Sequence, residues 1–402
     1  MPINLDEYRD VAPKGTIDLL RRLSEMGKDK RFLHVTGTRY GSGAPEILRR
    51  LVPMMQTLGI ETRWEVITGG QDFFGVAKSL YNAMQGREQV IPDDMYQTYL
   101  EVNRRNAKTL NLDADLVMVH DLQPAALVEQ RPRGRWVWRC HLDLSQPQRR
   151  VWSFLRQFVN RYDAAVFSLP AFAQRLNIPQ YLIYPSIDPL SDKNRELTRS
   201  EVQHILERLA IPRDKPIILQ IARFDRFSDL LGVINAYRLA RKHHDCRLVL
   251  AGGGVVHDPE GEAVLAEVQT ATAHDSDIHV LQLPPEADLE INALQRAATI
   301  VLQQSLKEGF ALTVAEAMWK GKPVIGGTAS GIRFQIIHEV TGYTVHSVEG
   351  AAFRLRYLFN NPELIGRMGA AAREHVRRNF LITRHLSDYL TLLCIFRDGS
   401  SG

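Results

Sequence analysis

Two glutamates, Glu308 and Glu316, lie eight residues apart where an apolar segment meets a helical one. Residues 300–305 suit a buried strand, and a helix is predicted to run to about Lys320. A loop that ends at a helix N-terminus offers free backbone N–H groups, which favour an anion. Both carboxylates can accept hydrogen bonds from hydroxyl groups. The segment therefore predicts a phosphate cradle flanked by two hydroxyl acceptors, as a nucleotide sugar requires.

A glycine-containing loop, with Gly41, Ser42 and Gly43, follows the first predicted strand. Glycine adopts positive φ easily and lets a backbone approach a ligand closely. The spacing is not Gly-x-Gly-x-x-Gly, and no acidic residue closes the next strand, which disfavours a dinucleotide oxidoreductase. We predict a ligand-binding loop here, with a plain tight turn as the alternative.

Histidine and aspartate occur at the ends of two neighbouring predicted strands. His120 and Asp121 end one strand, and Arg139, His141 and Asp143 end the next. Histidine can donate to a sugar hydroxyl or exchange a proton near neutral pH. A lone histidine is more often structural, but two such groups at adjacent strand ends favour a binding site. No third ligand with metal spacing accompanies them, so no metal site is predicted.

Two arginines, Arg223 and Arg226, follow the first predicted strand of the second half of the chain. Guanidinium groups bind phosphate oxygens in bidentate fashion, so this pair can neutralise a diphosphate. Two ordinary surface arginines are the alternative.

Composition narrows the class of protein. The chain has 402 residues, of which 45% are hydrophobic and 24% charged, and a formal net charge of +4. The length favours two domains, and the mild charge does not indicate nucleic acid. Three separated cysteines without metal spacing fit a reducing compartment. With no apolar run that spans a bilayer and no basic-then-apolar leader, we expect a cytoplasmic protein without a membrane span.

Apolar segments alternate with helical patterns along the chain, which predicts an α/β fold of two Rossmann-like, doubly wound parallel-sheet domains. The predicted domains are residues 1–190 and 191–378, with residues 379–402 packing back toward the first. A ligand is expected in the cleft between domains, at the carboxyl ends of strands. The predicted strands are residues 32–36, 62–67, 116–120, 136–140, 164–168, 181–184, 217–222, 247–251, 279–283, 300–304, 323–326 and 343–345.

Several longer segments carry a family resemblance. The chain resembles the retaining GT-B nucleotide-sugar glycosyltransferases, and within them is most similar to the trehalose glycosyltransferring synthases. The resemblance covers most of the chain. Its segments are residues 119–127, 138–145, 185–191, 258–261, 316–324 and 379–385.

The resemblance implies transfer of glucose from a nucleoside diphosphate glucose to free glucose, giving trehalose with retained configuration. It implies that Glu316 holds the ribose and that Glu308 holds the donor sugar with the backbone of Gly309 and Phe310. It further implies that His141 contacts the sugar near the reacting bond, so that His141, Glu308 and Arg223 carry catalysis. We further place Ala311, Leu312, Ser228, Arg226, Gly41, Ser42 and Gly43 at the predicted donor site, and His120, Asp121, Arg139 and Asp143 at the predicted acceptor site.

No enzymic nucleophile is implied, because the leaving phosphate helps to deprotonate the acceptor while the protein positions and stabilises charge. The implied partners are the donor and a sugar acceptor, without nucleic acid, and a homodimer is compatible with them. No cofactor is obligatory, and Mg²⁺ would at most assist the leaving diphosphate.

Four positions depart from the family pattern. Ser228 stands where a lysine usually completes the diphosphate clamp, and Ala311 stands where glycine is usual. Ser330 replaces the first glycine of a Gly-Gly turn, and Pro45 stiffens the chain after the glycine loop. Two alternatives therefore stay open, namely a related transferase with another acceptor and a non-catalytic homologue that binds sugar nucleotides.

Overall fold

The computed structural model describes residues 3–41, 43–253 and 259–397. The predicted loop residue Ser42, and Asp258 at the start of one family segment, lie outside these ranges. The chain divides into two compact units, one of Met1–Ser186 with Ile382–Gly402 and one of Ile187–Leu381. Within the described ranges, we find no helix that is both long and apolar enough to cross a membrane.

Unit 1, formed by the first and last segments of the chain, is built on a six-stranded parallel sheet of order β2-β1-β3-β4-β5-β6. The order reverses between β1 and β3, where Val35 pairs with Val119. Every strand predicted in this part of the chain has a counterpart. The strands are β1(Arg31–Thr36), β2(Glu61–Val66), β3(Leu116–His120), β4(Arg135–Cys140), β5(Ala164–Phe167) and β6(Gln180–Leu182).

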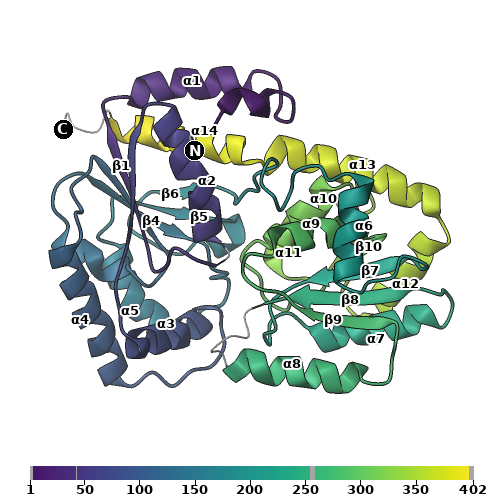
Figure 1. Cartoon of the computed structure of the whole chain (residues 1–402). Helices are drawn as coiled ribbons and strands as arrows, with labels where there is room; N and C mark the ends of the chain where they lie inside the picture. Colours follow the sequence, from purple (N-terminus) through teal and green to yellow (C-terminus); the bar gives the residue numbers. More distant parts are fainter. Residues whose placement is uncertain (1–2, 42, 254–258, 398–402) are drawn as a thin grey trace. The chain divides into compact units, whose positions relative to one another are not determined.

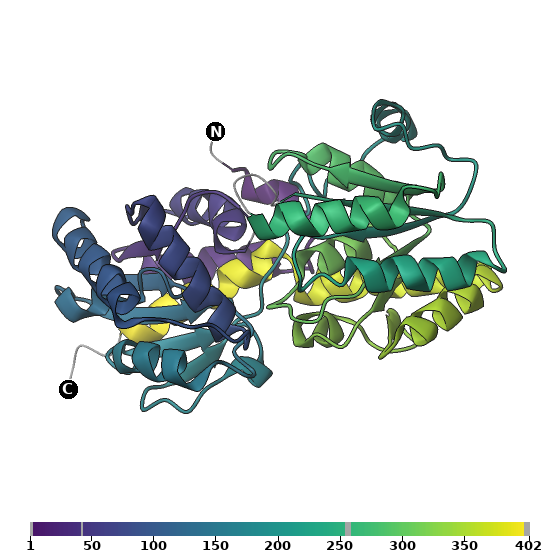
Figure 2. The same ribbon diagram turned by 90° about the horizontal axis from the view of Figure 1, so that it is seen from below.

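Helices cover both faces of this sheet. Helices α1, α2 and α14 pack together on one face, and α3, α4 and α5 lie on the other, which is nearer the viewer in Figure 2. The last helix packs so tightly on α1 that a Cβ added to Gly27 would lie 2.8 Å from the Leu393 side chain. The helices are η1(Leu5–Arg9), α1(Thr16–Gly27), α2(Ala44–Thr57), α3(Gln71–Met84), α4(Asp93–Thr109), η2(Ala125–Gln130), α5(Arg149–Val159), η3(Pro170–Phe172) and α14(Ile382–Arg397).

Unit 2 contains a second six-stranded parallel sheet, of order β12-β11-β10-β7-β8-β9. This is the doubly wound Rossmann order, and its direction reverses between β7 and β10. Each predicted strand again has a counterpart. The strands are β7(Ile217–Ile221), β8(Arg247–Gly252), β9(Ile278–Gln282), β10(Ile300–Gln303), β11(Val324–Gly326) and β12(Gly342–Thr344).

The helices of unit 2 form two layers. Helices α7, α8 and α12 bury a common core against one face of the sheet, while α6, α9 and α10 pack together on the other (Figure 1). Helix α6 begins with a capping box between Thr198 and Glu201, a strong start signal in the sequence. The helices are α6(Arg199–Arg208), α7(Leu230–Arg241), α8(Pro259–Thr272), α9(Asp288–Ala297), α10(Leu312–Trp319), α11(Ser330–Gln335), α12(Val348–Phe359) and α13(Pro362–Asn379).

Candidate functional site

The strand order of unit 2 brings two predicted ligand loops side by side. Ligands of open parallel sheets bind beyond the carboxyl ends of the strands, where the order reverses. Here that point lies between the loop after β7, which carries Arg223, and the loop after β10, which carries Glu308. The backbone N–H of Leu306 donates to the carbonyl oxygen of Phe227 at 2.7 Å, which ties the two loops together.

Asp225 organises the loop after β7. Its carboxylate lies 2.6 Å from the Arg223 guanidinium and accepts a 2.8 Å hydrogen bond from the Ser228 hydroxyl. Ser228 is buried, whereas Arg226 points to the Glu267 carboxylate on α8 with contacts of 2.5 and 2.6 Å. The predicted diphosphate residues therefore all have partners in the protein, and their role in binding stays a prediction.

Glu308 lies close to this cluster in a half-buried position. Burial raises the pKa of its carboxyl to about 7, against the opposing effects of the Arg223 charge and of N–H groups from Ala311 and Gly309. The nearby Asp225 carboxylate raises the pKa further. Near neutral pH, Glu308 can thus either accept or donate a hydrogen bond, which suits it to a hydroxyl group.

Glu316, on the second turn of α10, is almost fully buried. Its Oε1 lies 3.8 Å from the Lys193 ammonium, and its side chain is 1% exposed. The next turn carries buried Lys320, whose ammonium donates to Asn194 and Gln295 at 2.8 Å each. Burial lowers the pKa of Lys320, while the Glu316 charge opposes this. Our sequence reasoning missed the lysines, although the spacing of four from Glu316 to Lys320 places both on one helix face.

Helix α11, which carries Gly331 and Gln335, packs on the β10–α10 loop and holds it in place. The side-chain amide of Gln335 donates to the carbonyl oxygens of Phe310, Ala311 and Gly331. A Cβ added to Gly331 would lie 2.6 Å from Phe310 Cα and 2.8 Å from the Glu308 carbonyl oxygen. Gln335 carried no motif in the sequence, although it is fully buried and sets the position of the predicted donor-sugar backbone.

Ala311, which precedes Leu312 at the start of α10, has φ of 66° and ψ of 74°. This left-handed conformation favours glycine, which gives a physical reason for the glycine that the family usually has there. The alanine does not disturb the start of the helix, since α10 begins at the next residue.

The predicted glycine loop of unit 1 adopts backbone conformations that need glycine. Gly41 has φ of 96°, and Gly43 has φ of 82° with ψ of −128°. Helix α2 begins directly afterwards, with Pro45 in its first turn, where the missing N–H costs nothing. The structure thus accounts for the glycines locally, and ligand binding by this loop stays a prediction.

Three histidines line up on neighbouring strands in unit 1, with His34 inside β1, His120 at the end of β3 and His141 directly after β4. Nδ1 of His34 lies 3.1 Å from Nε2 of His120, and Nδ1 of His120 lies 3.1 Å from Nε2 of His141. The backbone N–H of His141 donates to Asp121 Oδ1 at 2.7 Å. Burial raises the pKa of Asp121 to about 6, and the residue has a left-handed φ of 61°. Sequence reasoning found three of these four residues but missed His34.

Three predicted acceptor-site side chains lie in the interior. Arg139, Asp143 and His120 are 0%, 1% and 2% exposed. Arg139 donates to the Ile183 carbonyl oxygen at 2.7 Å, and Asp143 accepts the Ser145 N–H at 2.9 Å. All three side chains are thus buried in this structure, and their role at the acceptor stays a prediction.

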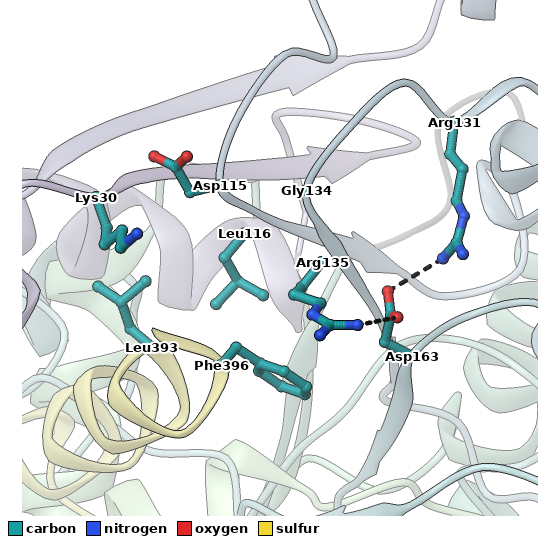
Figure 3. A pocket seen from close by; sticks show the side chains of 9 residues that line it. All are labelled: Lys30, Asp115, Leu116, Arg131, Gly134, Arg135, Asp163, Leu393 and Phe396. Carbon is teal, nitrogen blue, oxygen red and sulfur yellow. Dashed lines mark hydrogen bonds and ion pairs between the residues drawn. The ribbon is translucent and has the colours of Figure 1, made fainter. Parts of the chain in front are cut away.

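A cavity of about 390 Å³ in unit 1 lies at the opposite edge of the sheet (Figure 3). Its lining residues Lys30, Asp115, Gly134 and Asp163 precede strands, whereas the predicted site residues follow them. Asp163 pairs with two arginines of the rim, as the dashed lines show. The cavity is therefore separate from the predicted site. Among the described residues, no group of three or more His, Cys, Asp or Glu side chains is placed to hold a metal ion.

Comparison with known families matches both units. The family model described as "Trehalose synthase, N-terminal domain" matches residues 34–174, and that described as "Glycosyl transferases group 1" matches residues 202–375. The chain is 43% identical over 396 residues to a trehalose synthase of Pyrococcus horikoshii, covering 97% of this chain and 95% of that protein. It is 36% identical to a trehalose synthase of Rubrobacter xylanophilus, covering 96% of each.

Solved structures show the same fold. A UDP-forming α,α-trehalose-phosphate synthase from Burkholderia xenovorans superimposes with a TM-score of 0.73 over 90% of this chain and 99% of that one. The two sequences are 14% identical, so the likeness concerns the fold alone.

Proposed function

Because the chain belongs to the trehalose synthase family of GT-B glycosyltransferases, we propose that it moves glucose from a nucleoside diphosphate glucose to free glucose, forming trehalose with retained configuration. Glycosyl transfer related to trehalose follows from the family itself. The nucleotide donor, the glucose acceptor and the stereochemistry are the proposal.

The observation that carries the proposal is the pair of loops at the switch point of unit 2. One loop supplies the Arg223 cation, and the other supplies Glu308 beside two backbone N–H groups. A cation suits a diphosphate, and a carboxyl group with pKa near 7 suits a sugar hydroxyl.

Binding of a diphosphate requires Arg223 to exchange a partner. Its guanidinium is half-exposed and pairs with the Asp225 carboxylate. At 55% exposure the guanidinium is open to phosphate oxygens, while the Asp225 carboxylate is only 14% exposed. Asp225 would keep the Ser228 hydroxyl as a hydrogen-bond donor.

In the proposed reaction the C1–O bond to the diphosphate breaks, and a new C1–O bond to the acceptor forms on the same face of the sugar. The leaving phosphate oxygen takes the proton of the acceptor hydroxyl, so the nucleoside diphosphate is the second product. Arg223 neutralises the charge that develops on the leaving diphosphate. Glu308 fixes the sugar by its hydroxyl groups, so that the reacting atoms meet in one orientation.

The decisive experiment incubates the protein with UDP-, ADP- or GDP-glucose and a panel of acceptors, including glucose, and identifies products by mass and NMR. We expect α,α-trehalose with glucose. A different glycoside would show that glucose is not the acceptor. A product with inverted configuration would exclude a retaining mechanism. No product with any donor would refute the proposal.

Glu316→Gln tests the donor half of the site by calorimetry with nucleoside diphosphates. Loss of charge-assisted bonds to ribose should weaken binding by about 1.5–3 kcal/mol, roughly 10- to 100-fold. Glu349→Gln, at an exposed position on α12, is the control and should leave affinity unchanged. Equal affinity in both variants would remove Glu316 from the nucleotide site.

A non-catalytic sugar-nucleotide binder is the second candidate. The observation that favours it is that Ser228 carries no charge at the position where a second diphosphate cation is usual, and that Arg226 is paired with Glu267. Nucleotide binding without product across the whole donor and acceptor panel would establish this alternative.

A further inference from the structure

The row of histidines in unit 1 continues inward from the predicted sugar-contacting residue. His141 is partly exposed, His120 is 2% exposed and His34 is fully buried. Both imidazole contacts measure 3.1 Å between nitrogen atoms, which is a hydrogen-bond distance. Among the described residues, none hydrogen-bonds Nδ1 of His141, so this atom is available to a ligand.

All three rings are uncharged near neutral pH. Burial lowers the pKa of His34 to about 3 and lowers the pKa of His120 and His141 far below its ordinary value. The buried Arg139 cation lowers the pKa of the last two further. A neutral imidazole has one N–H and one bare nitrogen, so each ring in the row must donate on one side and accept on the other.

Only two arrangements of protons satisfy both contacts. In one, every N–H points toward His141, which leaves Nε2 of His34 bare and Nδ1 of His141 protonated. In the other, every N–H points inward, which leaves an N–H at Nε2 of His34 and a bare Nδ1 on His141. The environment of His34 Nε2 therefore decides what His141 presents to a ligand.

The inner end of the row favours the first arrangement. Nε2 of His34 is buried and makes no hydrogen bond to any part of the chain that the structure describes. Its ring stacks on Phe32 and on Tyr389, with ring centroids 4.4 and 5.7 Å away. Buried N–H groups without an acceptor are rarer in proteins than bare acceptors, so the bare nitrogen belongs at this end.

We propose that His34 and His120 are positioning residues that lock His141 in the tautomer with a proton on Nδ1. His141 then presents a fixed hydrogen-bond donor, and its other nitrogen is occupied by His120. The group it recognises is an acceptor oxygen, such as that of a sugar hydroxyl. His141 is thereby a binding donor and not a general base. The sugar ligand rests on the function proposed above, whereas the tautomer does not.

The tautomer can be measured in the resting protein. Nitrogen-15 NMR of histidine-labelled protein at pH 7.5 distinguishes a protonated ring nitrogen from a bare one. We expect Nδ1 of His141 and of His120 to be protonated and both Nε2 atoms to be bare. A proton on Nε2 of His141, or an imidazolium at this pH, would overturn the proposal whether or not the protein makes trehalose.

Two substitutions at the buried end separate positioning from packing. His34→Phe keeps the stacked ring but removes the donor to His120, so His141 should become a mixture of tautomers and turnover should fall about tenfold, with unchanged nucleotide affinity. His34→Asn returns an N–H donor near Nδ1 and should restore both the single tautomer and most of the turnover. His279→Phe, on strand β9 of unit 2, is the matched control and should change neither quantity.

The outcomes keep the two proposals distinct. A single Nδ1–H tautomer in the wild type with no product from any donor upholds the histidine row and refutes the transferase function. If the protein forms product and His34→Phe leaves the His141 tautomer unchanged, the positioning role of His34 is refuted and the transferase function stands. If His34→Phe fails to fold, the wild-type spectrum alone decides.

Discussion

Ala311 carries a local strain whose cost can be measured. Its left-handed φ of 66° disfavours a side chain by about 1–2 kcal/mol, and replacement by glycine relieves this while losing one buried methyl group. These terms nearly cancel, so Ala311→Gly should change the free energy of unfolding by less than about 0.5 kcal/mol. Ala315→Gly, within α10, should cost at least about 1 kcal/mol.

Urea denaturation of the two variants makes the comparison. If Ala311→Gly costs as much as Ala315→Gly, the left-handed conformation carries no strain. The family glycine at this position would then need another explanation.

Ser228 occupies the position where a second diphosphate cation is usual. The hydroxyl bonds Asp225, and the backbone oxygen accepts from Gln220 at 2.8 Å, so the loop does not depend on the hydroxyl alone. Ser228→Lys should tighten binding of a nucleoside diphosphate by about 1.5–3 kcal/mol through a charge-assisted bond. Calorimetry measures the affinity for a nucleoside diphosphate, with Ser228→Met as the uncharged control. An equal effect of Met and Lys would argue against a diphosphate beside this loop.

At the level of elements, helix α11 and the β10–α10 loop form one packed unit. An added Cβ at Gly331 would lie 2.6 to 2.8 Å from backbone atoms of Phe310 and Glu308, which cannot rotate away. Gly331→Ala should therefore displace the Glu308 loop, weaken nucleotide binding about tenfold or more, and cost about 1–3 kcal/mol of stability.

Gly366→Ala is the matched control for this substitution. Gly366 lies in α13 with open space around its Cβ direction, so alanine there should stabilise the protein by about 0.5–1 kcal/mol. Thermal unfolding and calorimetry distinguish the two. Intact nucleotide binding in Gly331→Ala would show that the loop position does not matter.

The elements were predictable because their signals are local. Strands buried on both faces are near-continuous apolar segments, as residues 300–303 show. Helices α6 and α2 begin with residues typical of helix N-termini, namely Thr198 as an N-cap and Pro45 in the first turn. The loops that carry Arg223 and Glu308 were predicted from the alternation of strands and helices together with the family motif.

Side-chain burial at the site was not predictable from the same signals. His120 and Arg139 are paired residues at strand ends, where both faces of the sheet are covered. Alternation along such a strand does not tell an interior side chain from one at the rim, so the burial of these residues could not be foreseen, and their role at the acceptor stays a prediction. His34 and Gln335 act through contacts with residues distant in sequence, which no spacing reveals.

At the scale of the whole molecule, stability depends on carboxyl groups with opposite pKa shifts. Ion pairing with arginines lowers the pKa of Asp113 and of Glu374 to about 2, so their stabilisation is present above the unfolded pKa and is lost as pH falls through the folded value. Burial raises the pKa of Asp121 to about 6 and of Glu308 to about 7. Their protonated forms favour the folded state, so this stabilisation is present below the unfolded pKa and is lost as pH rises through the folded value.

The buried histidines His34, His120 and His141 oppose Asp121 and Glu308, because their lowered pKa makes the unfolded state bind more protons as pH falls below their ordinary pKa of 6.5. Together the shifts predict a stability maximum near neutral pH and a decline toward acid pH. Glu308 loses its contribution as pH rises from its ordinary pKa of 4.5 to about 7. Glu308→Gln should therefore raise the free energy of unfolding at pH 8 by about 1–2 kcal/mol, after allowance for solvent screening, and change it little at pH 4. Urea denaturation at one-unit steps from pH 4 to 8 measures the curve, with Glu349→Gln as the exposed control. If the Glu308→Gln and wild-type curves run parallel, the Glu308 carboxyl titrates normally. It would then enter the site fully ionised, as an acceptor only.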